Sequence, residues 1–141
     1  MKLGFISSIL DGWSFDEMLD VADSLGFECI EVACWPQGKA ERRYAGVSHI
    51  DVSGMTEKKA ADILEKFRQK NIEISSLAFY PNTMDPEPEK RKANIDHLMK
   101  VIDASAMLGV NMVTTFIGRD QSKSVEENLQ LVKEIWPDII R

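Results

Sequence analysis

The chain has 141 residues, 44% of them hydrophobic, which is enough for one compact domain, 1–141, with its own core. Its 17 basic and 23 acidic residues give a formal charge of −6, which disfavours binding to a nucleic-acid backbone. No apolar run approaches the roughly 20 residues that span a bilayer, and no secretory signal is recognisable, so we expect no membrane partner and a cytoplasmic location.

The first half of the chain contains two units in which a strand precedes a helix. The first strand is predicted over residues 2–7, and Ser14 with Glu17 forms a capping box that begins a helix. The second strand is FECIEVA, residues 27–33, and Thr56 can cap the helix that follows it after a long polar loop. Long loops after strands are often functional.

The second half repeats this order. IEISSLAF, residues 72–79, is the third strand, and Asp85 and Pro86 are predicted to cap and begin a long helix that ends at Gly109. Residues 111–117 form the fourth strand, and a second capping box at Ser124 begins the last helix. Four such units with a period of about 40 residues predict parallel strands covered by helices.

Two folds are built from such units, an open doubly wound sheet and a β/α barrel. The first strand is not followed by the G-x-G-x-x-G pattern of dinucleotide-binding sheets. A whole eight-unit barrel needs about 250 residues, so this chain has room for half. Its last helix carries an apolar stripe up to the final residues, as expected of a chain that continues. The sequence therefore favours an α/β fold, the (βα)4 half of a TIM barrel, with an open flavodoxin-like sheet as the rival.

Three segments, GFECIEVACWP, ISSLAFYPN and LGVNMVTTFIGRD, resemble in order and spacing the N-terminal half of the xylose isomerase-like TIM barrels. That superfamily includes sugar phosphate isomerases and epimerases, inosose dehydratases, hydroxypyruvate isomerases and endonuclease IV. Endonuclease IV has extra metal-binding histidines where this chain has Tyr80 and Phe116, so the DNA-repair branch is disfavoured.

The resemblance also implies a divalent metal, Mn, Mg, Co or Zn, held by Glu, Asp, His and Glu side chains at the ends of strands five to eight. Two of those glutamates would move a proton on a carbon beside a carbonyl. All of these strands would follow Arg141, so no catalytic residue and no metal ligand is assigned to this chain. We expect the chain alone to be inactive.

Binding residues are expected where the strands end, because barrel loops converge there on the axis. Trp35 and Phe116 offer apolar faces to a sugar, and Tyr80 and Asn82 offer a hydroxyl and an amide. Packing of Trp35 at the rim and turn formation by Asn82 are the simpler alternatives.

Charged residues complete the expected substrate-binding set. Arg119 can pair with a carboxylate or phosphate, and Asp120 can orient it or accept a sugar hydroxyl, although a surface pair without function is the rival interpretation. Glu31 lies within an apolar strand, where its carboxylate needs either a structural ion pair or a polar active site. Alternation places Glu31 on the face opposite Ile30 and Val32.

The remaining histidines and cysteines are expected to have no chemical role. His49 shares a loop with residues 42–44, which could cover an anion, but a solvated loop is favoured. His97 is predicted to face solvent, opposite the apolar stripe of its helix. Cys29 and Cys34 fit neither a disulfide framework nor a zinc site, so we expect reduced cysteines.

We therefore expect the N-terminal half of a metal-dependent sugar or sugar phosphate isomerase/epimerase that contributes a substrate-binding wall. The alternative is a non-catalytic half-barrel that binds a ligand and self-associates, forming a homodimer through its exposed strand edges.

Overall fold

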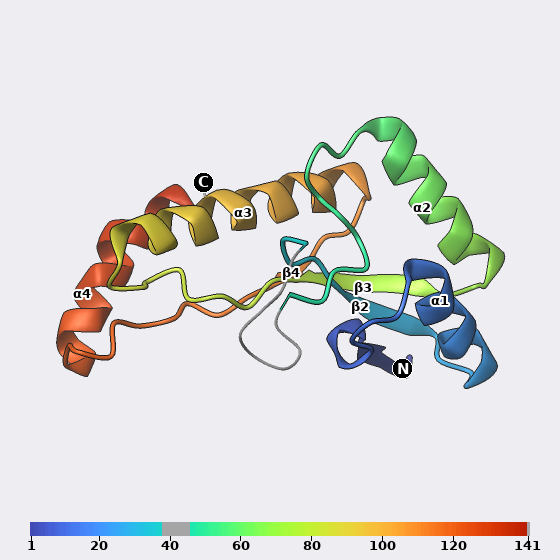
Figure 1. The fold of residues 1–141 in the computed structure, drawn as a ribbon, viewed down its shortest axis with the longest axis horizontal. Helices are drawn as coiled ribbons and strands as arrows, with labels where there is room; N and C mark the ends of the chain where they lie inside the picture. The colour runs from blue at the N-terminus through green and yellow to red at the C-terminus, as the bar shows by residue number, and fades with distance from the viewer. Residues whose placement is uncertain (38–45, 141) are drawn as a thin grey trace.

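The computed structural model describes residues 1–37 and 46–140, which form a parallel sheet with helices packed beside it (Figure 1). Each of the first three strands is followed by a longer helix and then by the next strand, and a fourth helix follows the last strand. In chain order the elements are β1 (Gly4–Ile6), η1 (Ser7–Ile9), α1 (Phe15–Ser24), β2 (Cys29–Ala33), α2 (Glu57–Gln69), β3 (Glu73–Ala78), α3 (Pro88–Met107), β4 (Val113–Thr114), α4 (Val125–Ile135) and η2 (Trp136–Asp138).

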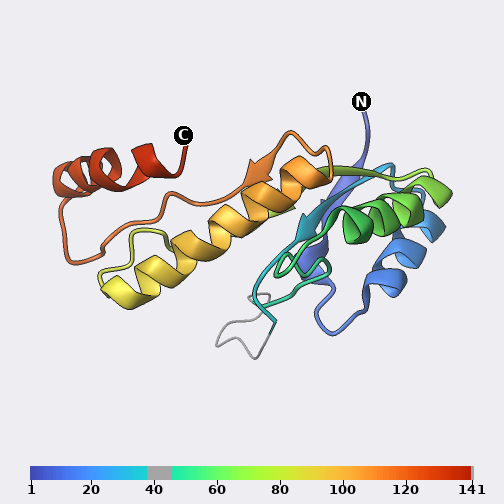
Figure 2. The same ribbon diagram turned by 90° about the horizontal axis from the view of Figure 1, so that it is seen from above.

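The strand order confirms the predicted half-barrel. The four strands of the described sheet lie in the order β1-β2-β3-β4, and each pairs in parallel with the next. A doubly wound sheet would reverse this order at a switch point, so the flavodoxin-like alternative is wrong. Figure 2 shows α1 and α2 side by side, with α4 at the opposite end of the molecule.

Local capping signals were read correctly at three helices. Ser14 and Ser124 each form the predicted capping box, and the Thr56 hydroxyl accepts a hydrogen bond from the Lys59 amide. The start of α3 was predicted wrongly: its first residue is Pro88 rather than Pro86. The Asp85 carboxylate instead accepts from the amide of Glu87, 3.0 Å away, and closes a turn before the helix. No helix in the described ranges is long and apolar enough to cross a membrane.

Strand β2 is the centre of the core and alternates as predicted. Ile30 and Val32 are fully buried, whereas Glu31 between them is only partly buried on the other face. The pairing of β2 with β3 contains a bulge, because Ile30 is opposite Ile74 but Glu31 is opposite Ser76. The bulge brings a hydroxyl next to the carboxylate of Glu31.

The prediction that His97 faces solvent is wrong. Its side chain is buried, and its Nε2–H donates to the carbonyl oxygen of Cys34, 2.7 Å away. Its ring packs against Phe79, with ring centroids 4.5 Å apart. The buried residues of α3 include His97, Leu98 and Val101, whereas Ile95, Met99 and Ile102 of the expected stripe are only partly buried against the core. Burial is possible because the polar edge of the ring finds a backbone acceptor.

The prediction of a solvated loop around His49 is also wrong. His49 is buried, and its Nδ1 lies 3.0 Å from the Oγ of Ser7, which itself accepts a hydrogen bond from the Ala33 amide. A bridge between Cys34 and Ser48 folds this part of the loop back onto the end of β2. The predicted partners of His49, residues 42–44, lie outside the described residues.

Both cysteines are free, as predicted. Cys34 is fully buried, and burial raises the pKa of its thiol to about 12. A thiol with such a pKa stays protonated at neutral pH and is a poor nucleophile. Cys34 is therefore a packing residue of the core.

Candidate substrate-binding rim

The ends of β2, β3 and β4 meet at one edge of the sheet because the strands are parallel (Figure 1). The seven expected binding residues all lie within or shortly after these strands. They fall into three groups: a hydroxyl–carboxylate cluster on the strands, a row of aromatic rings above it, and the polar loop segment after β4.

The first group centres on Glu31 and joins three strands. Its carboxylate accepts hydrogen bonds from the Ser76 hydroxyl, at 2.8 Å, and from the hydroxyl of Tyr80. The Tyr80 oxygen also lies 3.2 Å from the Oγ1 of Thr114. Among the described residues the partners of Glu31 are thus hydroxyl groups. Within those residues its carboxylate does not form the structural ion pair that was the alternative expectation.

The Tyr80 hydroxyl is held in its neutral form. Burial raises its pKa above the usual value, and the bond to Glu31 adds to this rise. The Tyr80 hydroxyl therefore stays protonated at neutral pH and acts as the hydrogen-bond donor to the Glu31 carboxylate. Glu31 and Thr114 of this cluster are both partly exposed.

The second group is a row of three rings along the strand ends. The ring centroids of Trp35 and Tyr80 are 5.6 Å apart, and those of Tyr80 and Phe116 are 4.8 Å apart. Trp35 also packs against Phe79 and is only 9% exposed, whereas Phe116 is 61% exposed. Phe116, rather than Trp35, therefore offers the open apolar face of this row.

The third group depends on Asn82, which ties the loop after β3 to the loop after β4. Its Nδ2 donates to the carbonyl of Arg119 at 2.8 Å, and its Oδ1 accepts from the amides of Arg119 and Met84, each at 3.0 Å. Gly118 has a φ of +79°, and a Cβ there would lie 1.9 Å from the Oδ1 of Asn82. Asn82 thus positions the Gly118–Arg119 backbone, and its Oδ1 already accepts two hydrogen bonds.

Arg119 and Asp120 are adjacent in sequence but have different surroundings. Asp120 is buried, and its Oδ1 accepts from the amide and hydroxyl of Ser122 at 2.9 and 2.6 Å, bonds that lower its pKa. Its backbone is held by the amide side chain of Asn128. Arg119 is exposed, and its guanidinium forms no hydrogen bond or ion pair within ranges 1–37 and 46–140.

Sequence reasoning missed Ser76 and Thr114 as members of the cluster. Thr114 lies in the run VTT, where alternation alone does not show which threonine faces the carboxylate. Ser76 was hidden by the bulge, which shifts the register of Ser75 and Ser76 by one residue. A Ser-Ser pair in the strand predicted next to a glutamate within an apolar strand was the one available signal.

No group of three or more His, Cys, Asp or Glu side chains that could hold a metal ion occurs in the described part of the chain. The rim residues therefore do not fit the divalent metal that the resemblance implies. The carboxylate of Glu31 and that of Asp120 are both engaged by hydroxyl groups.

The sequence profile of the xylose isomerase-like TIM barrel family matches residues 19–141. No curated protein matches the chain. Among solved structures, the xylose isomerase domain protein from Planctomyces limnophilus is similar, with 15% identity, a TM-score of 0.64, and coverage of 98% of this chain and 48% of that one. So is D-psicose 3-epimerase with D-tagatose from Clostridium cellulolyticum H10, with 14% identity, a TM-score of 0.57, and coverage of 99% and 48%.

The chain therefore spans about half the length of the solved structures it resembles. Because the sequence identity is low, the similarity to these structures supports the fold alone. The profile match over most of the chain supports the family. Four parallel βα units in sequential order are what half of a β/α barrel requires. The chain belongs to the xylose isomerase-like TIM barrel family, of which it represents the first half of the barrel.

Proposed function

We propose that this chain supplies the substrate-binding wall of a sugar or sugar phosphate isomerase or epimerase. The observation that carries the proposal is the cluster of Glu31, Tyr80 and Thr114 beside the exposed ring of Phe116, at the strand ends where barrel enzymes bind their substrates. The divalent metal and the proton-transferring carboxylates would belong to the other half of the barrel. The whole enzyme's activity rests on that missing half.

The first two groups of the rim have separate roles in this proposal. The Phe116 ring contacts the C–H face of the sugar, while its neighbour Tyr80 packs behind it. Glu31 accepts a hydrogen bond from a sugar hydroxyl, with its orientation held by Ser76 and Tyr80. Trp35, being largely buried, supports the aromatic row rather than providing most of its contact area.

Sugar chemistry also suits the family. One similar structure is an epimerase crystallised with D-tagatose, a ketose. A site of one carboxylate, hydroxyl groups and an open aromatic face is matched to a polyhydroxylated ligand with an apolar face. We extend this ligand class to the present chain as part of the proposal.

The test uses saturation-transfer difference NMR on the 141-residue chain with a panel of aldoses, ketoses and their phosphates. We expect at least one panel member to bind weakly, and we expect Phe116→Ala to remove its signal. Trp13→Ala is the matched control, since Trp13 is also an exposed aromatic residue, at 46% exposure, but follows β1 and η1. Equal loss in both variants, or no binding by any sugar, would refute the proposed wall.

A second measurement addresses catalysis. Aldose–ketose interconversion is assayed with the chain alone and added Mn²⁺, Mg²⁺, Co²⁺ or Zn²⁺. We expect no turnover, because no cluster of metal-ligating side chains occurs in the described ranges. Turnover that depends on an added metal would contradict the assignment of the metal site to the other half.

The non-catalytic alternative is favoured by the open strand edges. Within the described part of the sheet, strands β1 and β4 each pair on one side only, and the apolar side chains of Met112, Phe116 and Ile117 near β4 are exposed. A self-associating half-barrel would cover these residues with a second copy. Analytical ultracentrifugation distinguishes the two cases: a discrete dimer favours the binding module, and a monomer favours a half that awaits its own second half.

A further inference from the structure

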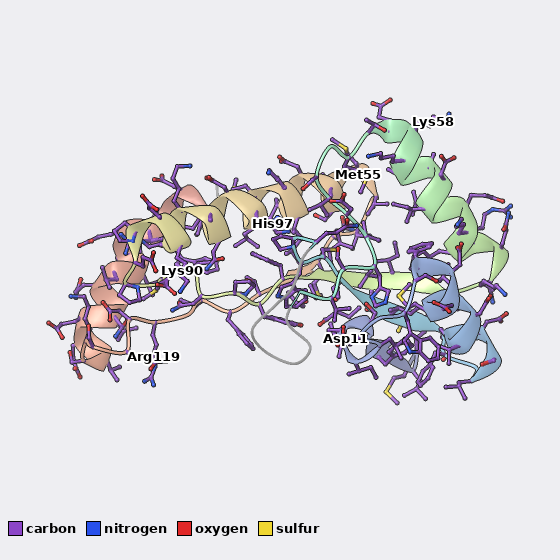
Figure 3. All side chains as sticks on the ribbon, in the orientation of Figure 1. Asp11, Met55, Lys58, Lys90, His97 and Arg119 are labelled. Atoms are coloured by element: carbon purple, nitrogen blue, oxygen red, sulfur yellow. The ribbon has the colours of Figure 1, made fainter. Side chains whose placement is uncertain are left out.

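A cavity of about 630 Å³ lies at the third group of the rim and is not lined by the sugar-contacting residues Glu31, Tyr80 and Phe116. Its walls come from the loop after β3, the first turns of α3 and the loop after β4. Asn82, Lys90, Asn94, Arg119 and Ser122 are among the residues that line it. Figure 3 shows Lys90 and Arg119 at the end of the molecule where α3 begins and α4 lies.

The two cations of the cavity are available for a ligand. The Arg119 guanidinium has no partner in ranges 1–37 and 46–140. The Lys90 ammonium lies 3.6 Å from the carboxylate of Glu87, and the two side chains are 65% and 59% exposed. An ion pair with this geometry and exposure contributes little, so a ligand can compete for Lys90.

The two carboxylates that line the same cavity are already engaged. Asp85 accepts a hydrogen bond from the amide of Glu87, and Asp120 accepts two from Ser122. These bonds occupy Oδ1 of each carboxylate and hold both groups in turns of the backbone. Both carboxylates keep their negative charge, so the lining is neutral as a whole, and an anion would bind at the Arg119 guanidinium and the Lys90 ammonium.

The frame that carries these cations is held by side chains from several elements. Asn82 binds the Arg119 backbone through both its amide nitrogen and its amide oxygen, and Asn94 on α3 donates to the Asn82 carbonyl at 2.9 Å. Asn128 on α4 holds the backbone of Asp120. A backbone that is already fixed reduces the conformational cost of binding a ligand.

We propose that this cavity binds an anionic group, a phosphate or a carboxylate, of the ligand whose carbon skeleton lies on the rim. Arg119 provides a planar fork of N–H donors, and Lys90 provides a point charge on the other wall. Asn82 and Arg119 lie two and three residues after Tyr80 and Phe116, so both loops that line the anion site begin at the aromatic row. The assignment of both the rim and the cavity to one anionic substrate rests on the proposed function.

The test is a ¹H–¹⁵N NMR titration of the whole chain with inorganic phosphate at neutral pH and constant ionic strength. We expect saturable shifts at the amides of Lys90, Asn94 and residues 119–122. Arg119→Gln and Lys90→Gln should each weaken phosphate binding by roughly ten-fold, since one charge-assisted hydrogen bond is lost. Both side chains are exposed, so we expect both variants to fold.

Lys58→Gln is the matched control. It removes the same charge from an exposed lysine on α2, far from the cavity (Figure 3). If Lys58→Gln weakens binding as much as Lys90→Gln, the shifts reflect non-specific attraction and the site is refuted. Absence of saturable shifts in the unmodified chain refutes it as well. A parallel titration with acetate identifies which anion is preferred, and tighter binding by either one supports the site.

A third arm separates this inference from the proposed function. Glucose 6-phosphate and glucose are compared in the same titration, with Phe116→Ala as the rim variant. Phosphate binding that survives Phe116→Ala while no sugar binds the rim supports the anion site and rejects the sugar wall. Sugar binding at Phe116 without any response of residues 119–122 to phosphate rejects the anion site and retains the wall.

Discussion

Replacement of Gly118 by alanine tests how the loops after β3 and β4 are joined. Gly118 has a φ of +79°, and an alanine Cβ at this position would lie 1.9 Å from the Oδ1 of Asn82 and 3.2 Å from its Cα. The first distance is impossible for non-bonded atoms, so the Asn82 side chain must move. Its three hydrogen bonds to the Arg119 backbone and the Met84 amide would then be lost.

The expected cost has two parts. The left-handed backbone conformation costs an alanine about 1–2 kcal/mol. Loss of the Asn82 hydrogen bonds adds about 1–3 kcal/mol, because each contributes roughly 0.5–1.5 kcal/mol net and this side chain is partly exposed. The total, about 2–5 kcal/mol, is a large part of the roughly 5–15 kcal/mol that stabilises a typical domain.

The assay is urea unfolding followed by circular dichroism, with Gly109→Ala as the matched control. Gly109 also has a positive φ, +64°, but a Cβ there meets nothing within 4 Å. Gly109→Ala should therefore show only the backbone cost. In an Asn82→Ala background the cost of Gly118→Ala should fall close to the same value, because the Oδ1 and Cγ atoms are gone and only the Cα at 3.2 Å remains. Equal destabilisation by Gly118→Ala and Gly109→Ala would refute the proposed contact.

Three further predictions concern single hydrogen-bonding groups. Tyr80→Phe should lower the unfolding free energy by about 1–2 kcal/mol at neutral pH. Because the folded-state pKa of Tyr80 is raised, the stabilisation by its hydroxyl decreases as pH rises above about 10. Urea unfolding at neutral pH and above about pH 10 should therefore show the stability difference between the variant and the unmodified chain becoming smaller. Burial lowers the pKa of His49, so the contribution of His49 to the unfolding free energy is complete above about pH 6.5 and falls as pH drops. His49→Gln should therefore make the unfolding free energy depend less on pH between about pH 7 and 5. An unchanged slope would contradict this. Ser124→Ala removes the capping box of α4 and should cost about 1 kcal/mol, measured by thermal unfolding against Ser53→Ala, a loop serine whose side chain caps no helix.

The sequence by itself determined the order and type of the elements. The capping boxes at Ser14 and Ser124 and the alternation of Ile30, Glu31 and Val32 each involve residues within about four positions of one another. Such short-range patterns depend on backbone geometry that the chain adopts wherever it folds. Such patterns defined four strand–helix units in series, and these units were enough to predict sequential parallel strands and the half-barrel.

Only the tertiary structure decided which side chains meet. His97 reaches the Cys34 carbonyl across 63 positions, and Asn82 reaches the Arg119 backbone across 37. The bulge that sets Ser76 opposite Glu31 depends on how β3 aligns with β2, which no local pattern encodes. These contacts follow from the packing of α3 and the register of the strands. Both bring together residues that lie far apart in the sequence, so short-range patterns cannot specify them.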